Sequence, residues 1–404
     1  MLKLAVIGLL FLGAPSACGA DWPQWRGPKG DNISTEQGLA ASWPAAGPKE
    51  LWKLDAGIGY SSPVVVNDKV YLFTGVDGND VLYCLEPDTG KVIWKQSYDK
   101  GYTAAFPGTR ATPTILDGKI YTYGGNSDLV CWNQADGKLD WRLNVIKETG
   151  AGKNLEWGTA SCPLIVGDLI CVQNGAGGPV AVAVNRRTGK IVWQSEKGLG
   201  GYAHIIQVDV RGTRQLIVFG GKALYGMNPQ TGATLWKDAW ETQYDVNATT
   251  PIYADGRLFL STAYNTGHCA MFDLAPTGAT KAHESKDVTV RFQGMILDGG
   301  KLYANSEGTI KCLEWPTCKV LWSTKEPKLG MGGALLRIPG KRFIATSERG
   351  GLYMMQETDS GLKVIGEKKD AVEGKEVWAT PLVYKGKVYV KGAKDLVCFD
   401  ISGK

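Results

Sequence analysis

Short apolar segments separated by polar turns run along almost the whole chain. In "SSPVVVNDKVYLFTG", "ATPTILDGKIYTYGG" and "ATPLVYKGKVYVKGA", an apolar, β-branched run is followed by a polar turn and then by a second apolar run. Segments 201–221, 292–306 and 332–347 follow the same pattern with less regularity. Short runs bounded by Asp-Gly and similar turns predict β-hairpins. We therefore expect a chain built from short antiparallel strands.

A second pattern repeats between these hairpins, namely a turn followed by a strand that carries Trp. Its copies are "DTGKVIW" (88–94), "ADGKLDW" (135–141), "RTGKIVW" (187–193), "QTGATLW" (230–236) and "PTCKVLW" (316–322). Two weaker copies, "PTGATKA" (276–282) and "DSGLKVI" (359–365), have Ala and Ile at the Trp position. The steps between equivalent positions are 47, 52, 43, 46, 40 and 43 residues, the length of one propeller blade. The two patterns together predict an all-β, eight-bladed β-propeller of four-stranded antiparallel blades.

The last blade lacks its fourth strand, because "DISGK" (400–404) begins a further copy of the turn without the Trp strand. The segment "KELWKLD" (49–55) matches the Trp strand but has no strand of its own before it. We predict that Lys49–Asp55 pairs with Leu396–Asp400, so that an N-terminal strand completes the last blade and closes the ring. Closure would leave only short outer edges exposed.

The repeated turn resembles the PQQ-like (pyrroloquinoline-quinone-like) β-propeller repeat family, and "AVNRRTGKIVW" (183–193) is its closest copy. The segment "DWPQWRGPKGDNIS" (21–34) is similar to the start of secreted bacterial members. The resemblance covers essentially the whole mature chain. Because the family includes the outer-membrane β-barrel assembly lipoprotein and, more distantly, quinoprotein dehydrogenases, the resemblance implies the fold and leaves the function open.

The first twenty residues predict export from the cytoplasm. One Lys precedes an apolar or Gly run from Leu4 to Ala14, and small residues precede Asp21, as in a secretory signal peptide. We expect residues 1–20 to be that signal, 21–48 to form an N-terminal strap and 49–404 to form the propeller. The alternative is a lipid anchor at Cys18. No other segment is apolar enough to cross a membrane, so we predict a secreted or periplasmic protein.

Composition excludes some classes of protein. The formal net charge is +5 over 404 residues, and 44% of the residues are hydrophobic. This is a globular composition without a Lys/Arg tract, so we expect no nucleic-acid partner. We also expect a monomer. Four of the eight cysteines outside the signal stand ten residues before the Trp position, real or virtual: Cys84, Cys131, Cys312 and Cys398. We interpret them as packed thiols rather than disulfides or ligands.

Candidate chemistry concentrates at the mouth of the central channel. In a propeller the innermost strands and the loops before them converge there. The position three residues before the strand-A Pro, or its equivalent, reads in turn Tyr60, Arg110, Ala160, Tyr202, Ala248, Arg291, Gly330 and Trp378. Two positions later stand Ser62, Thr112, Cys162, His204, Thr250, Gln293, Gly332 and Thr380. The predicted ligand-binding funnel is Tyr60, Arg110, Trp157, Tyr202, His204, Asn247, Arg291, Gln293 and Trp378.

This funnel suits an anionic or aromatic ligand, since Arg offers paired donors and the rings offer stacking surfaces. The same positions also line propeller channels that hold only water. We find no GxSxG, P-loop, CxxCH or HExxH motif and no metal-ligand spacing among the three histidines, so we predict no catalytic and no metal-binding residue.

Three functions are compatible with the sequence. The favoured one is a non-catalytic binding or protein-interaction scaffold of the cell envelope, with a protein or envelope partner on the top-face loops. The second is a PQQ-dependent quinoprotein oxidoreductase with calcium, of the alcohol or sugar dehydrogenase type. The chain has no adjacent cysteine pair, which the resembling dehydrogenases use, and no calcium cluster can be placed, so we predict no cofactor. The third is a carbohydrate-binding propeller.

Overall fold

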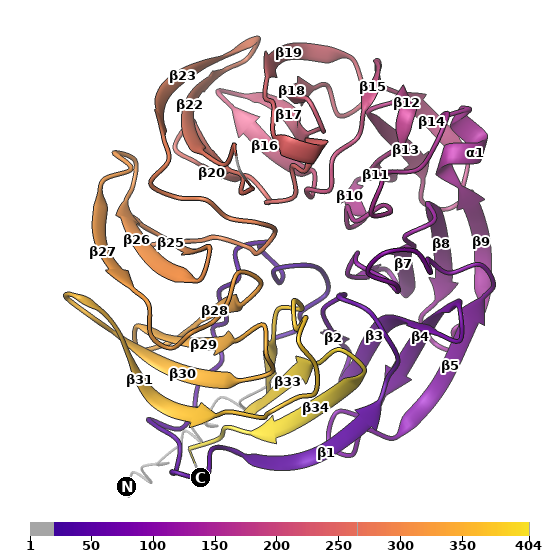
Figure 1. The fold of residues 1–404 in the computed structure, drawn as a ribbon. Helices are drawn as coiled ribbons and strands as arrows, with labels where there is room; N and C mark the ends of the chain where they lie inside the picture. Colours follow the sequence, from indigo (N-terminus) through magenta and orange to yellow (C-terminus); the bar gives the residue numbers. More distant parts are fainter. Residues whose placement is uncertain (1–19, 265, 404) are drawn as a thin grey trace, which may run out of the picture.

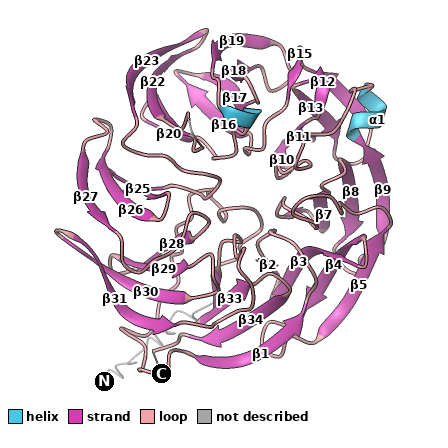
Figure 2. Cartoon of the chain, viewed as in Figure 1, coloured by secondary structure: helices cyan, strands magenta, loops and turns pink. Residues whose placement is uncertain are grey.

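The computed structural model describes residues 20–264 and 266–403, and these residues form eight four-stranded antiparallel sheets arranged as a ring (Figure 1). The predicted eight-bladed, all-β propeller is confirmed. The helical content is small, as Figure 2 shows: it consists of α1 (Val145–Thr149) and a 3-10 turn (Gln243–Asp245). The predicted signal peptide and Cys18 lie outside the described residues.

Each blade runs from an innermost strand A to an outermost strand D. Blade 1 contains β2 (Val64–Val66), β3 (Lys69–Val76), β4 (Asn79–Leu85) and β5 (Val92–Tyr98). Blade 2 contains β6 (Thr114–Leu116), β7 (Lys119–Tyr123), β8 (Asp128–Asn133) and β9 (Leu139–Asn144). Blade 3 contains β10 (Leu164–Val166), β11 (Leu169–Gln173), β13 (Ala181–Asn185) and β14 (Ile191–Gln194). Blade 4 contains β16 (Ile206–Val210), β17 (Thr213–Phe219), β18 (Ala223–Met227) and β19 (Thr234–Ala239).

The second half of the ring repeats this order. Blade 5 contains β20 (Ile252–Ala254), β21 (Arg257–Ser261), β22 (Cys269–Ala275) and β23 (Gly278–Ser285). Blade 6 contains β24 (Ile296–Asp298), β25 (Lys301–Ser306), β26 (Thr309–Glu314) and β27 (Val320–Thr324). Blade 7 contains β28 (Ala334–Ile338), β29 (Arg342–Thr346), β30 (Leu352–Thr358) and β31 (Gly361–Lys368). Blade 8 contains β32 (Leu382–Tyr384), β33 (Lys387–Lys391), β34 (Asp395–Asp400) and β1 (Lys49–Asp55).

The N-terminal strand closes the ring as predicted. Strand β1 pairs antiparallel with β34, from Lys49 opposite Asp400 to Asp55 opposite Asp395, with one bulge between Glu50 and Trp52. In Figure 1 the indigo β1 lies beside the yellow β34. A small two-stranded sheet of β12 (Ala176–Pro179) and β15 (Lys197–Leu199) was not predicted, because its Gly-rich first strand lacks the apolar run of the other strands.

The repeated Gly and Trp hold neighbouring blades together. In the turns between strands C and D, Gly90, Gly137, Gly189 and Gly232 have a φ near +70°, and a Cβ there would collide with the Trp of the preceding blade. The Trp52 indole covers Gly90 in this way, and the Trp193 indole covers Gly232. Trp193 Nε1 also donates to the Pro229 carbonyl at 3.1 Å in the next blade. The Trp strand and the Gly turn therefore form one interblade joint, which explains why they repeat together.

The strap, residues 21–48, crosses the channel instead of lying only beside it. Trp22 exchanges two backbone hydrogen bonds with Val65 in β2, and Ile115 in β6 donates to the Pro23 carbonyl. On the other side of the ring, Ser34 donates to the Arg337 carbonyl in β28. In Figure 1 an indigo segment accordingly passes through the central opening. The strap closes the channel at the face that carries the A–B turns, which we call the bottom face.

All eight cysteines of the described residues are buried and unpaired, so the interpretation as packed thiols agrees with the structure. In these residues no helix is long and apolar enough to cross a membrane.

Burial also raises the pKa of Cys162 and Cys171, which lowers the fraction of reactive thiolate. We therefore expect the mature protein to give eight reactive thiols in denaturant without reductant, and slow labelling when folded. Four or fewer thiols in denaturant would show that disulfides had been mistaken for packing. Titration with a chromogenic disulfide reagent measures both numbers.

Candidate functional site

A cavity of about 510 Å³ opens on the top face, among the loops that lead from strand D of one blade to strand A of the next. Its wall includes seven of the predicted funnel residues: Tyr60, Arg110, Trp157, Tyr202, His204, Arg291 and Trp378. The strap contributes Trp25 from below, so the cavity is a cup with a protein floor rather than an open channel. Their role as ligand-binding residues remains a prediction.

Asn247 and Gln293 do not line this cavity. The Asn247 side chain is fully buried, and its amide donates to the carbonyls of Gly220 and Gly221 at 2.7 and 3.1 Å. Gln293 is buried too and donates to the Gly332 carbonyl. Both amides satisfy loop carbonyls between blades, which is a structural task.

The ring of small polar residues below the mouth is a hydrogen-bonded belt. From blade 8 to blade 4, the backbone N–H of one residue donates to the side chain of its equivalent in the next blade. The pairs are Thr380 to Ser62, Ser62 to Thr112, Thr112 to Cys162, and Cys162 to His204, at 2.8 to 3.0 Å. These side chains supply the acceptors that short innermost strands leave missing. The belt thus fixes five blades at the channel wall.

His204 ends the belt and is held neutral. Its Nδ1 accepts the Cys162 N–H at 2.8 Å, so the ring hydrogen must reside on Nε2. The ring stacks on the Trp25 floor at 5.3 Å between centroids. Burial, together with the positive charge of Arg26, lowers the pKa of His204 to about 3. His204 therefore faces the cavity as a neutral N–H donor.

This neutral state predicts a pH dependence of stability. Because the pKa of His204 is about 3 when folded and about 6.5 in an ordinary chain, the unfolded state binds more protons between these values. The free energy of unfolding should therefore fall as the pH drops below about 6.5. Above about pH 6.5, His204 should add no pH dependence to it. His204→Asn keeps an acceptor for Cys162 but does not titrate, so thermal melting should show a shallower loss from pH 7 to 4.5. If the melting temperatures of the wild type and of His204→Asn fell equally from pH 7 to 4.5, His204 would not be the group that causes the loss.

The other donors of the same wall are Arg110 and Tyr202. The Arg110 guanidinium lies 4.4 Å from the Tyr102 ring centroid and donates to the carbonyls of Ala105, Phe106 and Gly108. Within 20–264 and 266–403 it has no carboxylate within ion-pair distance. Burial lowers the pKa of Arg110. The Tyr202 hydroxyl accepts the backbone N–H of Trp157 at 3.5 Å, which leaves the hydroxyl hydrogen of Tyr202 free to donate.

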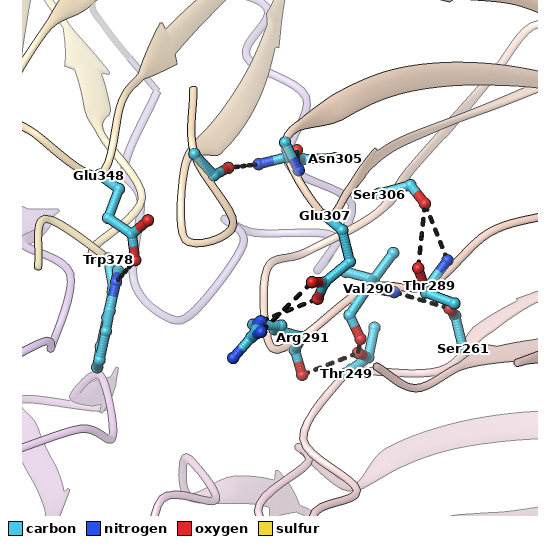
Figure 3. Close-up of polar contacts among 12 residues, drawn as sticks. Thr249, Ser261, Thr289, Val290, Arg291, Asn305, Ser306, Glu307, Glu348 and Trp378 are labelled. Carbon is cyan, nitrogen blue, oxygen red and sulfur yellow. Dashed lines mark hydrogen bonds and ion pairs between the residues drawn. The ribbon is translucent and has the colours of Figure 1, made fainter. Parts of the chain in front are cut away.

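Arg291, which the sequence placed in the same ring, is neutralised by a neighbour. Its guanidinium forms two hydrogen bonds to Glu307, at 2.9 and 3.3 Å, as Figure 3 shows. This ion pair raises the pKa of Arg291 against the opposing effect of burial, and the guanidinium also stacks on Tyr264 at 4.8 Å. Arg291 is therefore less available to an anionic ligand than the sequence suggested.

The cavity also contains two carboxylates that sequence analysis missed. Glu348 accepts the Trp378 indole N–H at 2.9 Å (Figure 3), and Glu376 accepts the Tyr60 hydroxyl at 3.3 Å. In the part of the chain that the structure describes, neither forms an ion pair. Glu348 lies in the loop between β29 and β30, which reaches the top face outside the surveyed register. A survey of those B–C loops would have found it.

An aromatic cluster joins the two carboxylates to the rest of the wall. Trp378 stacks on Tyr60 with 4.7 Å between centroids and contacts Phe292 and Phe106 at 4.9 and 5.4 Å. Apolar faces and a few oriented polar groups are the usual lining of a ligand pocket.

The resemblance to quinoprotein dehydrogenases implies PQQ and calcium, so we compared the cavity with that requirement. Calcium takes about six to eight oxygen ligands, mostly from carboxylates and carbonyls. Among the described residues no three His, Cys, Asp or Glu side chains are grouped closely enough to hold a metal ion. Glu348 and Glu376 instead accept hydrogen bonds from separate aromatic residues. The donor set of this cavity does not fit a calcium–quinone pair.

Comparison with known proteins agrees with this architecture. A family model described as "Outer membrane protein assembly factor BamB" matches residues 37–122 and 103–324, more than half of the chain. Proteins of that name from Moranella endobia and Shewanella oneidensis are 28% identical over 193 residues and 24% identical over 217 residues. The matches cover 45% and 51% of this chain and 46% and 50% of those proteins. The chain thus spans about half the length of the curated relatives it matches first.

A third relative matches over more of the chain. A tetrathionate hydrolase of Acidithiobacillus ferrooxidans is 22% identical over 422 residues, which cover 89% of this chain and 78% of that protein.

Two solved structures share the fold. BamB from Moraxella catarrhalis superposes with a TM-score of 0.61 at 16% identity, over 87% of this chain and 97% of that one. A quinohemoprotein alcohol dehydrogenase from Comamonas testosteroni gives 0.53 at 12% identity, over 95% and 81%. These likenesses concern the fold alone. From the family match and the eight blades, the chain belongs to the PQQ-like β-propeller family, in the group described as outer membrane protein assembly factor BamB.

Proposed function

We propose that the protein is a non-catalytic scaffold of the bacterial cell envelope that binds a polypeptide partner in the top-face cavity. The observation that carries the proposal is the closed aromatic cup, which holds charged groups without ion-pair partners in the described residues. A rigid ring with one such cup suits the recognition of a protruding segment of another protein.

The relatives support this proposal for place and partner class. Two of them are named outer membrane protein assembly factors, and the predicted signal peptide at 1–20 is consistent with export. We propose that the mature protein is periplasmic, with a lipid anchor at Cys18 as the alternative to free release. The cup, rather than the names of the relatives, supports the choice of the top face as the place where the partner binds.

Site-specific photo-crosslinking tests the proposal. Phe106, at the cavity rim, and Leu116, on the bottom face, are exposed to 38% and 39%, so they form a matched pair. A photoreactive phenylalanine at position 106, in protein exported to a bacterial periplasm, should give a polypeptide adduct that mass spectrometry identifies. The adduct should be absent at position 116. Ala160→Trp, which fills the cavity, should abolish it. Equal adducts at both positions, or an adduct unaffected by Ala160→Trp, would refute the proposal.

A second candidate function is hydrolysis of a sulfur oxyanion. It is favoured by the similarity to a tetrathionate hydrolase, which covers 89% of this chain. The donors Arg110, Tyr202 and His204 are able to hold an anion, although two carboxylates share the cavity. Incubation of the mature protein with tetrathionate, followed by ion chromatography, tests this candidate. Turnover that is lost in Arg110→Gln would replace the scaffold proposal. Unchanged tetrathionate would support the scaffold.

A further inference from the structure

We infer that the top-face cavity selects a zwitterionic ligand, a segment that carries a guanidinium or ammonium group close to a carboxylate. This inference rests on the proposed function, because it concerns the same cavity. We derive the charge pattern of the ligand from the cavity groups that have no ion-pair partner within residues 20–264 and 266–403.

The acceptor side of the cavity lies on blades 7 and 8. Glu348 accepts the Trp378 indole N–H and Glu376 accepts the Tyr60 hydroxyl, and among the described residues neither carboxylate accepts a second side-chain hydrogen bond. A partly buried carboxylate gains from a charged partner, since it has lost some of its hydration. The Trp378 cluster adds aromatic faces, which attract cations. This side therefore fits a cationic group.

The donor side lies on blades 2 to 4. Arg110 precedes β6, and Tyr202 and His204 precede β16. Arg110 keeps donors beyond the three carbonyls it contacts, Tyr202 has a free hydroxyl hydrogen, and His204 presents Nε2–H. All three line the one cavity. These donors, which include a guanidinium without an ion-pair partner among the described residues, fit a carboxylate.

The two sides are close enough for one ligand to reach both. Tyr60 lies between them: its ring faces the Arg110 guanidinium at 5.9 Å, and its hydroxyl donates to Glu376. In an eight-bladed ring, blade 4 stands opposite blade 8, so the donors also face the acceptors across the mouth.

The other charges of the cavity leave this pattern intact. Arg291 is paired with Glu307, and Lys375 is exposed at the rim. A ligand of one charge sign would meet an unfavourable carboxylate or guanidinium, whereas a zwitterion satisfies both.

Four blocked amino acids provide the probes. N-acetylarginine carries both charges, its amide carries only the cation, N-acetylcitrulline carries only the anion, and N-acetylcitrulline amide carries neither. Isothermal titration of the mature protein, residues 21–404, should rank N-acetylarginine first. Loss of either charge should weaken binding about tenfold, the equivalent of about 1.4 kcal/mol.

Variants assign each charge to its side of the cavity. The double variant Glu348→Gln with Glu376→Gln should lose the preference for arginine over citrulline and keep the preference for carboxylate over amide. Arg110→Gln should do the reverse. Because Arg110 also holds the 105–108 loop, Tyr202→Phe serves as a second donor-side variant that removes only a hydroxyl. Glu314→Gln is the matched control, since Glu314 is an exposed carboxylate on blade 6 that accepts the Thr317 hydroxyl. It should leave the ranking unchanged.

The outcomes separate this inference from the proposed function. Equal binding of all four probes, or a ranking that the Glu348/Glu376 double variant does not alter, would overturn the zwitterion assignment even if crosslinking at Phe106 succeeds. The full ranking without a crosslinked polypeptide would uphold the charge pattern and refute the scaffold. Acetyl-Ala-Ala-Arg distinguishes the sources: tighter binding than N-acetylarginine indicates a polypeptide end, and weaker binding indicates a free small zwitterion.

Discussion

Deletion of residues 21–56 is expected to abolish the folded monomer. The deletion removes β1, so β34 loses its neighbour and blade 8 exposes a strand edge. It also removes Trp52, whose indole covers Gly90 and donates to the Pro87 carbonyl at 3.0 Å in blade 1. An open ring with an unpaired edge and an apolar face should aggregate. Sedimentation velocity and circular dichroism melting measure the loss of the monomer and of its cooperative transition.

A rearranged chain provides the control. Because Lys49 lies opposite Asp400, residues 49–56 can follow Gly403 through a short turn and pair with β34 as a hairpin. This protein still lacks the strap. It should nevertheless recover a cooperative monomer if the closing strand, rather than the strap, is what stabilises the ring. A deleted protein that stays monomeric with an unchanged melting temperature would refute closure by β1.

The Trp193→Ala substitution should cost about 3–5 kcal/mol of unfolding free energy, as expected for a large core truncation. Trp193 is only 6% exposed, packs on Gly232 and donates to the Pro229 carbonyl. Trp94 and Trp141 are half-buried, so the same change there should cost less. Denaturant unfolding monitored by far-UV circular dichroism measures each value. A loss of less than about 1 kcal/mol on substitution of Trp193 is typical of an exposed side chain, and would contradict a structural role for this residue.

Substitution of Gly232, the glycine that the Trp193 indole covers, tests the same interblade joint from its other side. Gly232→Ala adds a Cβ 2.3 Å from the Trp193 ring at a φ of +70°, whereas Gly118→Ala meets no atom within 4 Å at a φ of +72°. Both changes carry the strain of a left-handed Ala, about 1–2 kcal/mol, but only the first adds a collision. In a Trp193→Ala background the two costs should become equal. An unchanged difference in that background would show that the joint does not act through Trp193.

The blades and their closure could be predicted from the sequence because they repeat. Gly90, Gly137, Gly189 and Gly232 serve the same turn in four blades, and each is covered by the Trp of the blade before it. A local requirement that recurs at a fixed spacing is visible without a structure. The path of the strap was less visible, because Trp25 contributes to the cavity through a contact specific to one blade, its stacking on His204.

The candidate site could be predicted only in part, since ion pairing is not periodic. Arg110 and Arg291 occupy equivalent positions, yet Glu307 neutralises only Arg291. Glu348 and Glu376 lie on loops of different length and register, so no repeat indicated them. The sequence suggested a site for an anionic or aromatic ligand, whereas the structure brings donors and acceptors together in one cup. That difference changes the proposed ligand to a zwitterion.

The claim that the top-face cup binds a polypeptide segment is tested most directly by hydrogen–deuterium exchange of the mature protein, with and without saturating acetyl-Ala-Ala-Arg. We expect slower exchange in three separate parts of the cup: residues 105–110, 202–204 and 374–378. We expect unchanged exchange in the outer strands β5 and β14. Protection confined to those outer strands, or no protection at saturation, would contradict this claim.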